Sequence, residues 1–182
     1  VLAPPLRSGS GQYRVIEPLD ALQYQSKAET CVIEPEKPGQ TVRRVLTPLD
    51  VARHRPDRIL VQHSISDQDI TNLRNIRDTC PTAFIVQLMD DLTSDLPMNH
   101  PNFVFGQREG HVRTLQALEL SDRLIVSTQP LADYYARYCR DIRLVPNALD
   151  PQYWGQLVRT EPSARKRLRV GWAGAAQHLG DL

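Results

Sequence analysis

The stretch RILVQHSISDQDITNLRNIRDTCPTAFIVQLMDD, residues 58–91, is the most informative part of this sequence for its fold. Its first five residues are a short apolar run, typical of a buried parallel strand. Ser66 then begins a helix, with Asp69 three residues later in an acidic variant of the capping box, and Pro81 closes it. A second apolar run follows over 83–88. A strand, a helix and a strand of these lengths predict two parallel neighbours in one sheet.

The same alternation continues on both sides of this stretch, which predicts an α/β fold with a parallel sheet and helices on both faces. Such sheets bind ligands at the carboxyl ends of their strands. Further strands are expected over 1–6, 30–34, 123–126 and 142–145, and further helices over 13–25, around 112–118 and over 131–140. Pro18 must bend the first of these helices or end its first part.

The composition is that of an ordinary globular protein, and 182 residues fit one domain of usual size. A net charge of +1 gives no bulk field that would recruit nucleic acid. Cys31, Cys80 and Cys139 fit neither a zinc pattern nor a disulfide framework, which indicates a reducing cytoplasm. We find no apolar run near the roughly 20 residues that span a bilayer, and no signal peptide.

Polar residues follow two of the expected strands. Asp90 and Asp91 are adjacent carboxylates that could orient sugar hydroxyls, act as a base or hold a divalent ion. They could also be capping or solvated acids, but their position at a strand end favours a function. His63 follows a strand and His100 lies in a long loop over 92–105, where an imidazole could serve as a base. A lone histidine is more often structural.

Glycines mark two turns that could receive a phosphate. In SGSG, residues 8–11, the backbone N–H groups of Gly9, Ser10 and Gly11 could approach an anion, although a plain tight turn explains two glycines equally well. The cluster around Gly174 and His178 follows another apolar run, but its spacing is not that of a dinucleotide-binding loop, so NAD binding fits poorly. Three tyrosines are assigned to packing because of their helical spacing: Tyr134, Tyr135 and Tyr138.

Several stretches, taken in order, resemble family-4-like glycosyltransferases of bacterial surface-polysaccharide synthesis. Each motif is loose by itself, and their order along most of the chain is the specific part. The stretches are SGSGQYRVIEPLDAL (8–22), QLMDDLTSDLP (87–97), SDRLIVSTQPLADYY (121–135), LVPNALD (144–150) and VGWAGAAQHLGDL (170–182). The segment 144–150 carries alanine where the family's "PNGVD" segment has glycine.

The resemblance implies a GT-B fold of two Rossmann-like domains, in which an acceptor-side domain faces a donor-binding domain. It implies that Gly9 and Gly11 face the donor phosphates, that Gly174 belongs to the first donor-domain loop, and that Asp90 and Asp91 belong to an acidic loop of one subgroup. Together with the strand-end positions, this predicts a donor-phosphate site of Gly9, Ser10, Gly11, Gly174 and His178 and a catalytic group of Asp90, Asp91 and His63. The implied partners are a nucleotide sugar and a saccharide or lipid-linked acceptor, with no cofactor and no metal. The expected location is the cytoplasm, with a peripheral contact at the inner membrane.

The expected domains are an acceptor-side domain over 1–156, a linker over 157–167 and the truncated start of a donor domain over 168–182. The arginine and lysine that many relatives place after the donor-domain glycine are absent, since Ala175 and Leu179 stand there. We therefore expect the fragment itself to be inactive. A non-catalytic α/β binding or signalling module is the alternative, although in a receiver domain the paired acids follow the first strand.

Overall fold

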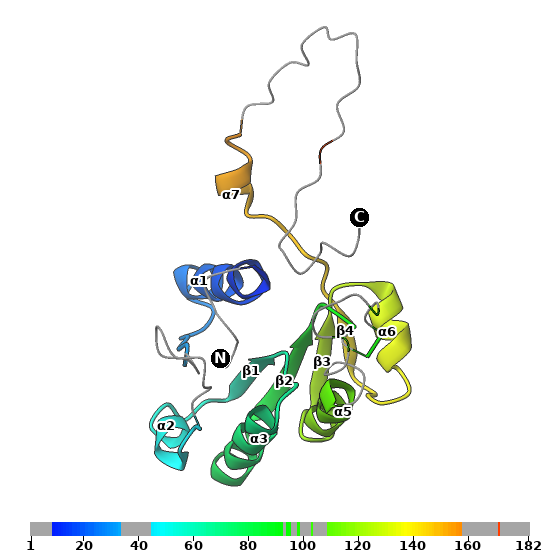
Figure 1. Cartoon of the computed structure of the whole chain (residues 1–182). Helices are drawn as coiled ribbons and strands as arrows, with labels where there is room; N and C mark the ends of the chain where they lie inside the picture. The colour runs from blue at the N-terminus through cyan, green and yellow to red at the C-terminus, as the bar shows by residue number, and fades with distance from the viewer. Residues whose placement is uncertain are drawn as a thin grey trace, which may run out of the picture.

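The computed structural model describes residues 9–33, 45–92, 94–95, 98, 103, 109–157 and 171. Its centre is a sheet of four strands in the order β1-β2-β3-β4, and every neighbouring pair is parallel. Figure 1 shows this order, with α2 at the β1 end of the molecule and α6 at the β4 end. The strands are β1 (Arg58–Gln62), β2 (Phe84–Met89), β3 (Arg123–Val126) and β4 (Ile142–Leu144). The predicted α/β class and the parallel pairing are therefore confirmed.

Among the described residues, the helices between the strands pack on one face of the sheet: α3 (Asp67–Thr79), α5 (His111–Glu119) and α6 (Gln129–Tyr135). Ile70, Leu73 and Ile76 of α3 are buried against the β1–β2 half of this face. Leu131 and Tyr135 of α6 are buried in a cluster with Leu124 and Val126 of β3, and α6 also contacts β4. Apolar side chains at helical spacing on α3 thus fix which face of the sheet the helix covers.

The opposite face is covered by the first helical segment, which begins as the π-helix η1 (Gln12–Ile16) and continues as α1 (Glu17–Tyr24). Val15 is fully buried there against Leu88 of β2. Pro18 lies in the first turn of α1, where its missing N–H costs least. The predicted division of this helix at Pro18 is therefore confirmed, and so is the prediction of helices on both faces.

Capping boxes begin two of the helices. The Ser66 hydroxyl accepts from the Asp69 N–H, and the Asp69 carboxylate accepts from the Ser66 N–H at 3.0 Å, as the sequence predicted for α3. Thr47 and Asp50 form the same arrangement at the short helix α2 (Pro48–Ala52), which the sequence analysis missed. Another short helix, α7 (Pro151–Trp154), follows β4.

Two predicted elements differ from the structure. The expected strand over 30–34 does not form in its described part, where Ile33 makes a single bridge. Val32 and Ile33 pack instead on opposite clusters of the core, so burial alone accounts for their apolar character. The helix expected over 131–140 ends at Tyr135, because the Tyr138 N–H bonds to the Tyr135 carbonyl, which tightens the chain into a turn.

Other expectations lie outside the described residues: the strand over 1–6, the linker from residue 158 on, nearly all of 168–182, and most of the loop over 92–105. In the part of the chain that the structure describes, no helix combines the length and the apolar character needed to cross a membrane.

Candidate functional site

The carboxyl ends of the first three strands bring polar residues to one edge of the sheet. Gln62 ends β1 and is followed by His63, Asp90 follows β2, and Ser127 follows β3. The Ser127 hydroxyl contacts the backbone carbonyl of Asp90 at 3.4 Å. Ligands of parallel α/β sheets bind at this edge, which makes it the candidate site.

The glycine loop reaches this edge from the amino-terminal helix. Gly9 has φ +53°, a left-handed conformation that favours glycine. This turn places Ser10 at the start of the helical segment, where its hydroxyl accepts a hydrogen bond from the Gln62 amide at 3.0 Å. The same hydroxyl also acts to lower the pKa of Asp90. The expectation that the loop meets the strand ends therefore holds for Ser10.

His63 and Asp90 form a directly hydrogen-bonded pair between the His63 Nε2 atom and the Asp90 Oδ1 atom. Their side chains are only 13% and 7% exposed. His63 itself has φ +50°, uncommon for a residue other than glycine, while its N–H extends the β1–β2 ladder by bonding to the Leu88 carbonyl at 3.1 Å. Such strained backbone clusters at functional sites, and here it turns the imidazole toward Asp90.

The Asp90 carboxyl is held in its ionised form. Burial acts to raise the pKa of Asp90, but the hydrogen bond and charge of His63, the Arg14 charge and the Ser10 hydroxyl outweigh it. The pKa of Asp90 therefore lies below its ordinary value. An ionised carboxylate bonded to one imidazole nitrogen fixes the ring orientation, and the Nδ1 atom of His63 has no hydrogen-bond partner among the described residues. This arrangement suits proton transfer.

Asp91 differs from its neighbour because its side chain is exposed. One ligand atom each from His63, Asp90 and Asp91 lies within 4.8 Å of the others, a spacing that a divalent cation could bridge. The Arg14 guanidinium opposes this use, since its positive charge acts on both aspartates. The geometry therefore favours the His63–Asp90 pair as the chemical group of the site.

Arg14 is a member of the site that the sequence analysis missed. It lies on η1 with its side chain buried, and its Nη1 atom donates to the Asn147 side chain and, at 3.5 Å, to the Val145 carbonyl. Burial acts first to lower the pKa of Arg14, against the opposing charge of Asp90. Its helical position gave no signal, because a charged residue within an amphipathic helix is usually exposed.

The remaining predicted residues divide into two groups. Gly11 is buried at the start of η1, beside Ser10, so the loop is in place. His100, Gly174 and His178 lie outside the described residues. The assignment of the tyrosines to packing is confirmed for Tyr135, which is fully buried with its ring edge-on to that of Tyr134.

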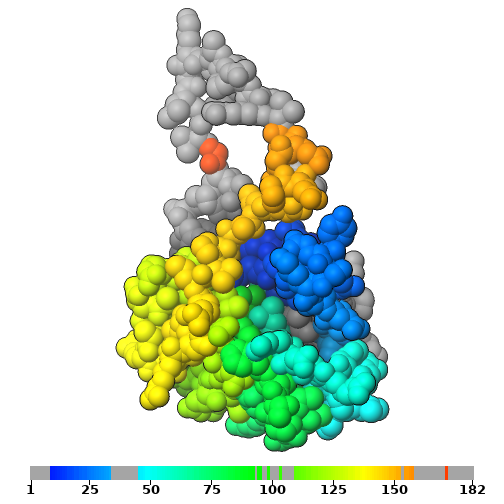
Figure 2. Space-filling view, turned by 180° about the vertical axis from the view of Figure 1, so that it is seen from behind, coloured from blue at the N-terminus to red at the C-terminus, as the bar shows by residue number. Residues whose placement is uncertain are grey.

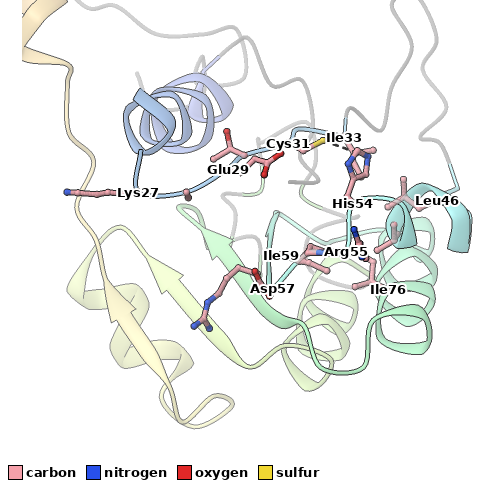
Figure 3. A pocket seen from close by; sticks show the side chains of 15 residues that line it. Lys27, Glu29, Cys31, Ile33, Leu46, His54, Arg55, Asp57, Ile59 and Ile76 are labelled. Carbon is pink, nitrogen blue, oxygen red and sulfur yellow. Dashed lines mark hydrogen bonds between the residues drawn. The ribbon is translucent and has the colours of Figure 1, made fainter. Parts of the chain in front are cut away.

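A separate cavity of about 780 Å³ lies at the amino end of β1. Figure 3 shows its walls, formed by the chain after α1 and by the residues that lead into β1, among them Cys31, His54 and Arg55. Of the predicted site residues that the structure describes, none lines it. The cavity and the His63–Asp90 pair are thus at opposite ends of the same strand.

The site rests on this geometry and on the chemistry of its residues. Comparison of the chain with protein-family models, with curated proteins and with solved structures gave no significant match.

Proposed function

We propose that this chain is the acceptor-side domain of a glycosyltransferase and that the His63–Asp90 pair receives the acceptor hydroxyl. The donor would be a nucleotide sugar, and the acceptor a saccharide or a lipid-linked saccharide in cell-surface polysaccharide synthesis. A cytoplasmic location with a peripheral contact at the inner membrane belongs to the same proposal. The ordered motifs of the sequence support it, since they resemble those of family-4-like glycosyltransferases.

The observation that carries the proposal is the hydrogen bond between His63 and the ionised Asp90 at the carboxyl edge of the sheet. In the transfer step, the acceptor oxygen forms a bond to the anomeric carbon as the bond to the nucleoside diphosphate breaks. The acceptor O–H proton passes to the imidazole of His63, and Asp90 stabilises the imidazolium that results. The diphosphate leaves with the bonding electron pair.

The Ser10 region would meet the leaving diphosphate. Backbone N–H groups at the start of a helix attract anions, and Ser10 begins the helical segment next to Asp90. This assignment puts the proton acceptor and the anion-binding turn on one edge of the sheet, as a displacement with an anionic leaving group requires.

The test uses the glycosyltransferase that contains this chain, screened with a panel of nucleotide sugars for transfer and for release of the nucleoside diphosphate. His63→Gln and Asp90→Asn keep side-chain size and should lower turnover by about 100-fold or more, as expected for loss of a general base. Asp95→Asn changes an exposed aspartate and should transfer at the parental rate. Parental turnover in both His63→Gln and Asp90→Asn would show the assignment to be wrong.

A further inference from the structure

The environment of Arg14 is unusual for a charged side chain. The residue is 8% exposed, and among the described residues no carboxylate forms an ion pair with it. Its Nε atom is buried without a hydrogen-bond partner. Burying a guanidinium in this way is costly, because charged donors lose their hydration. A residue kept there at such cost is a candidate for a role in the site.

Contacts connect Arg14 with both the site and the segment that follows β4. The Val145 N–H bonds to the Val126 carbonyl at 2.9 Å, so this segment starts beside the end of β3. Its next contacts are with Arg14, through the Val145 carbonyl and the Asn147 side chain. Figure 2 shows the segment, in yellow and orange, running beside the dark blue start of the first helical segment.

The His63 imidazole bonds to the Asp90 carboxylate from the end of β1. Ser10 and Arg14 act on the pKa of Asp90 from the first helical segment, and the charges of Asp90 and Asp91 act in turn on Tyr13. The cation among these groups, Arg14, is held by the segment after β4, more than 130 residues further along the chain.

We propose, resting on the function proposed above, that Arg14 is a positioning residue for the His63–Asp90 pair and that Asn147 holds it in place. The guanidinium keeps Asp90 as the anion that orients the imidazole of His63. Asn147 supplies an acceptor for the Nη1 atom in place of water, so the guanidinium stays beside Asp90 although it has no ion pair. A displacement of the 145–147 segment therefore moves the Arg14 charge and changes the pKa of Asp90.

The experiment follows the Asp90 side-chain carboxyl carbon by NMR as the pH of the intact chain is lowered. In Arg14→Met the midpoint of this titration should rise by about one pH unit, because the nearby positive charge is lost. Arg14→Lys keeps the charge and should restore most of the difference. Asn147→Ala leaves Arg14 in the chain but should also raise the midpoint. Arg137→Met removes an exposed cation that stacks on Tyr134 and should change nothing.

A midpoint unchanged in both Arg14→Met and Asn147→Ala would overturn the proposal. If Arg14→Met does not fold, Asn147→Ala decides, because Asn147 is exposed and its replacement disturbs no core contact. A midpoint equal to that of the parent in Asn147→Ala would then overturn the role of Asn147. The titration needs no turnover. A raised midpoint together with parental transfer by both His63→Gln and Asp90→Asn would refute the proposed function while leaving the Arg14–Asp90 coupling established.

Discussion

Replacing Gly9 by alanine tests the turn that brings Ser10 to the site. A Cβ atom at this position would meet no atom within 4 Å, so a steric clash contributes nothing to the cost. The backbone does contribute, because φ is +53° and a left-handed residue other than glycine costs about 1–2 kcal/mol. Alanine also lowers the conformational entropy of the unfolded chain, which offsets about 0.4–1 kcal/mol of this loss of stability. The expected net loss is about 1 kcal/mol.

Thermal unfolding followed by circular dichroism measures this loss. One kcal/mol lowers the Tm of a domain of this size by about 2–4 °C. Gly9→Asn should lose less than Gly9→Ala, because asparagine tolerates the left-handed region better. Gly171→Ala is the control, since a Cβ there also meets open space but the backbone is not left-handed. Equal Tm values for the parent, Gly9→Ala and Gly9→Asn would refute the reasoning.

Two further predictions concern the packing of the core and the loss of stability at acidic pH. Leu73→Ala should cost about 2–5 kcal/mol in urea denaturation because Leu73 is fully buried, whereas Leu49→Ala, at a position 74% exposed, should stay within about 0.5 kcal/mol of the parent. Equal losses would contradict the packing. Asp90 has a lowered pKa, so its contribution is present above the unfolded value of about 4 and is lost as the pH falls through the folded value. The stability difference between the parent and Asp90→Asn should therefore shrink as the pH is lowered from 5 to 2, and a constant difference would contradict the ionised state of Asp90.

Local signals in the sequence account for most of the sheet. The runs that became β1, β2 and β3 are apolar and flanked by helix signals, so periodicity located them within one residue at either end. The Ser66 capping box was equally local. The strand predicted over 30–34 was wrong because its apolar residues are buried by packing on two clusters of the core. Three apolar residues in a row are too few for their spacing to distinguish such packing from a strand.

The sequence predicted only those residues of the candidate site that follow an expected strand. Parallel topology brings His63 and Asp90 to one edge, so their convergence followed from the sequence. The sequence did not predict which of the two adjacent aspartates pairs with the imidazole, because Asp90 and Asp91 are chemically identical and only the fold buries Asp90 and leaves Asp91 exposed.

Arg14 was beyond sequence reasoning altogether. Its partners Val145 and Asn147 are more than 130 residues away, and a helix of mixed polarity conceals a buried cation. The residues that follow a strand can therefore be recognised in the sequence as candidates for chemistry. The charge that shifts their pKa can lie on any segment that the fold brings close, and the sequence does not reveal which. In this protein the cation that acts on Asp90 lies on the first helical segment and is hydrogen-bonded to the segment after β4, so its place follows only from the fold.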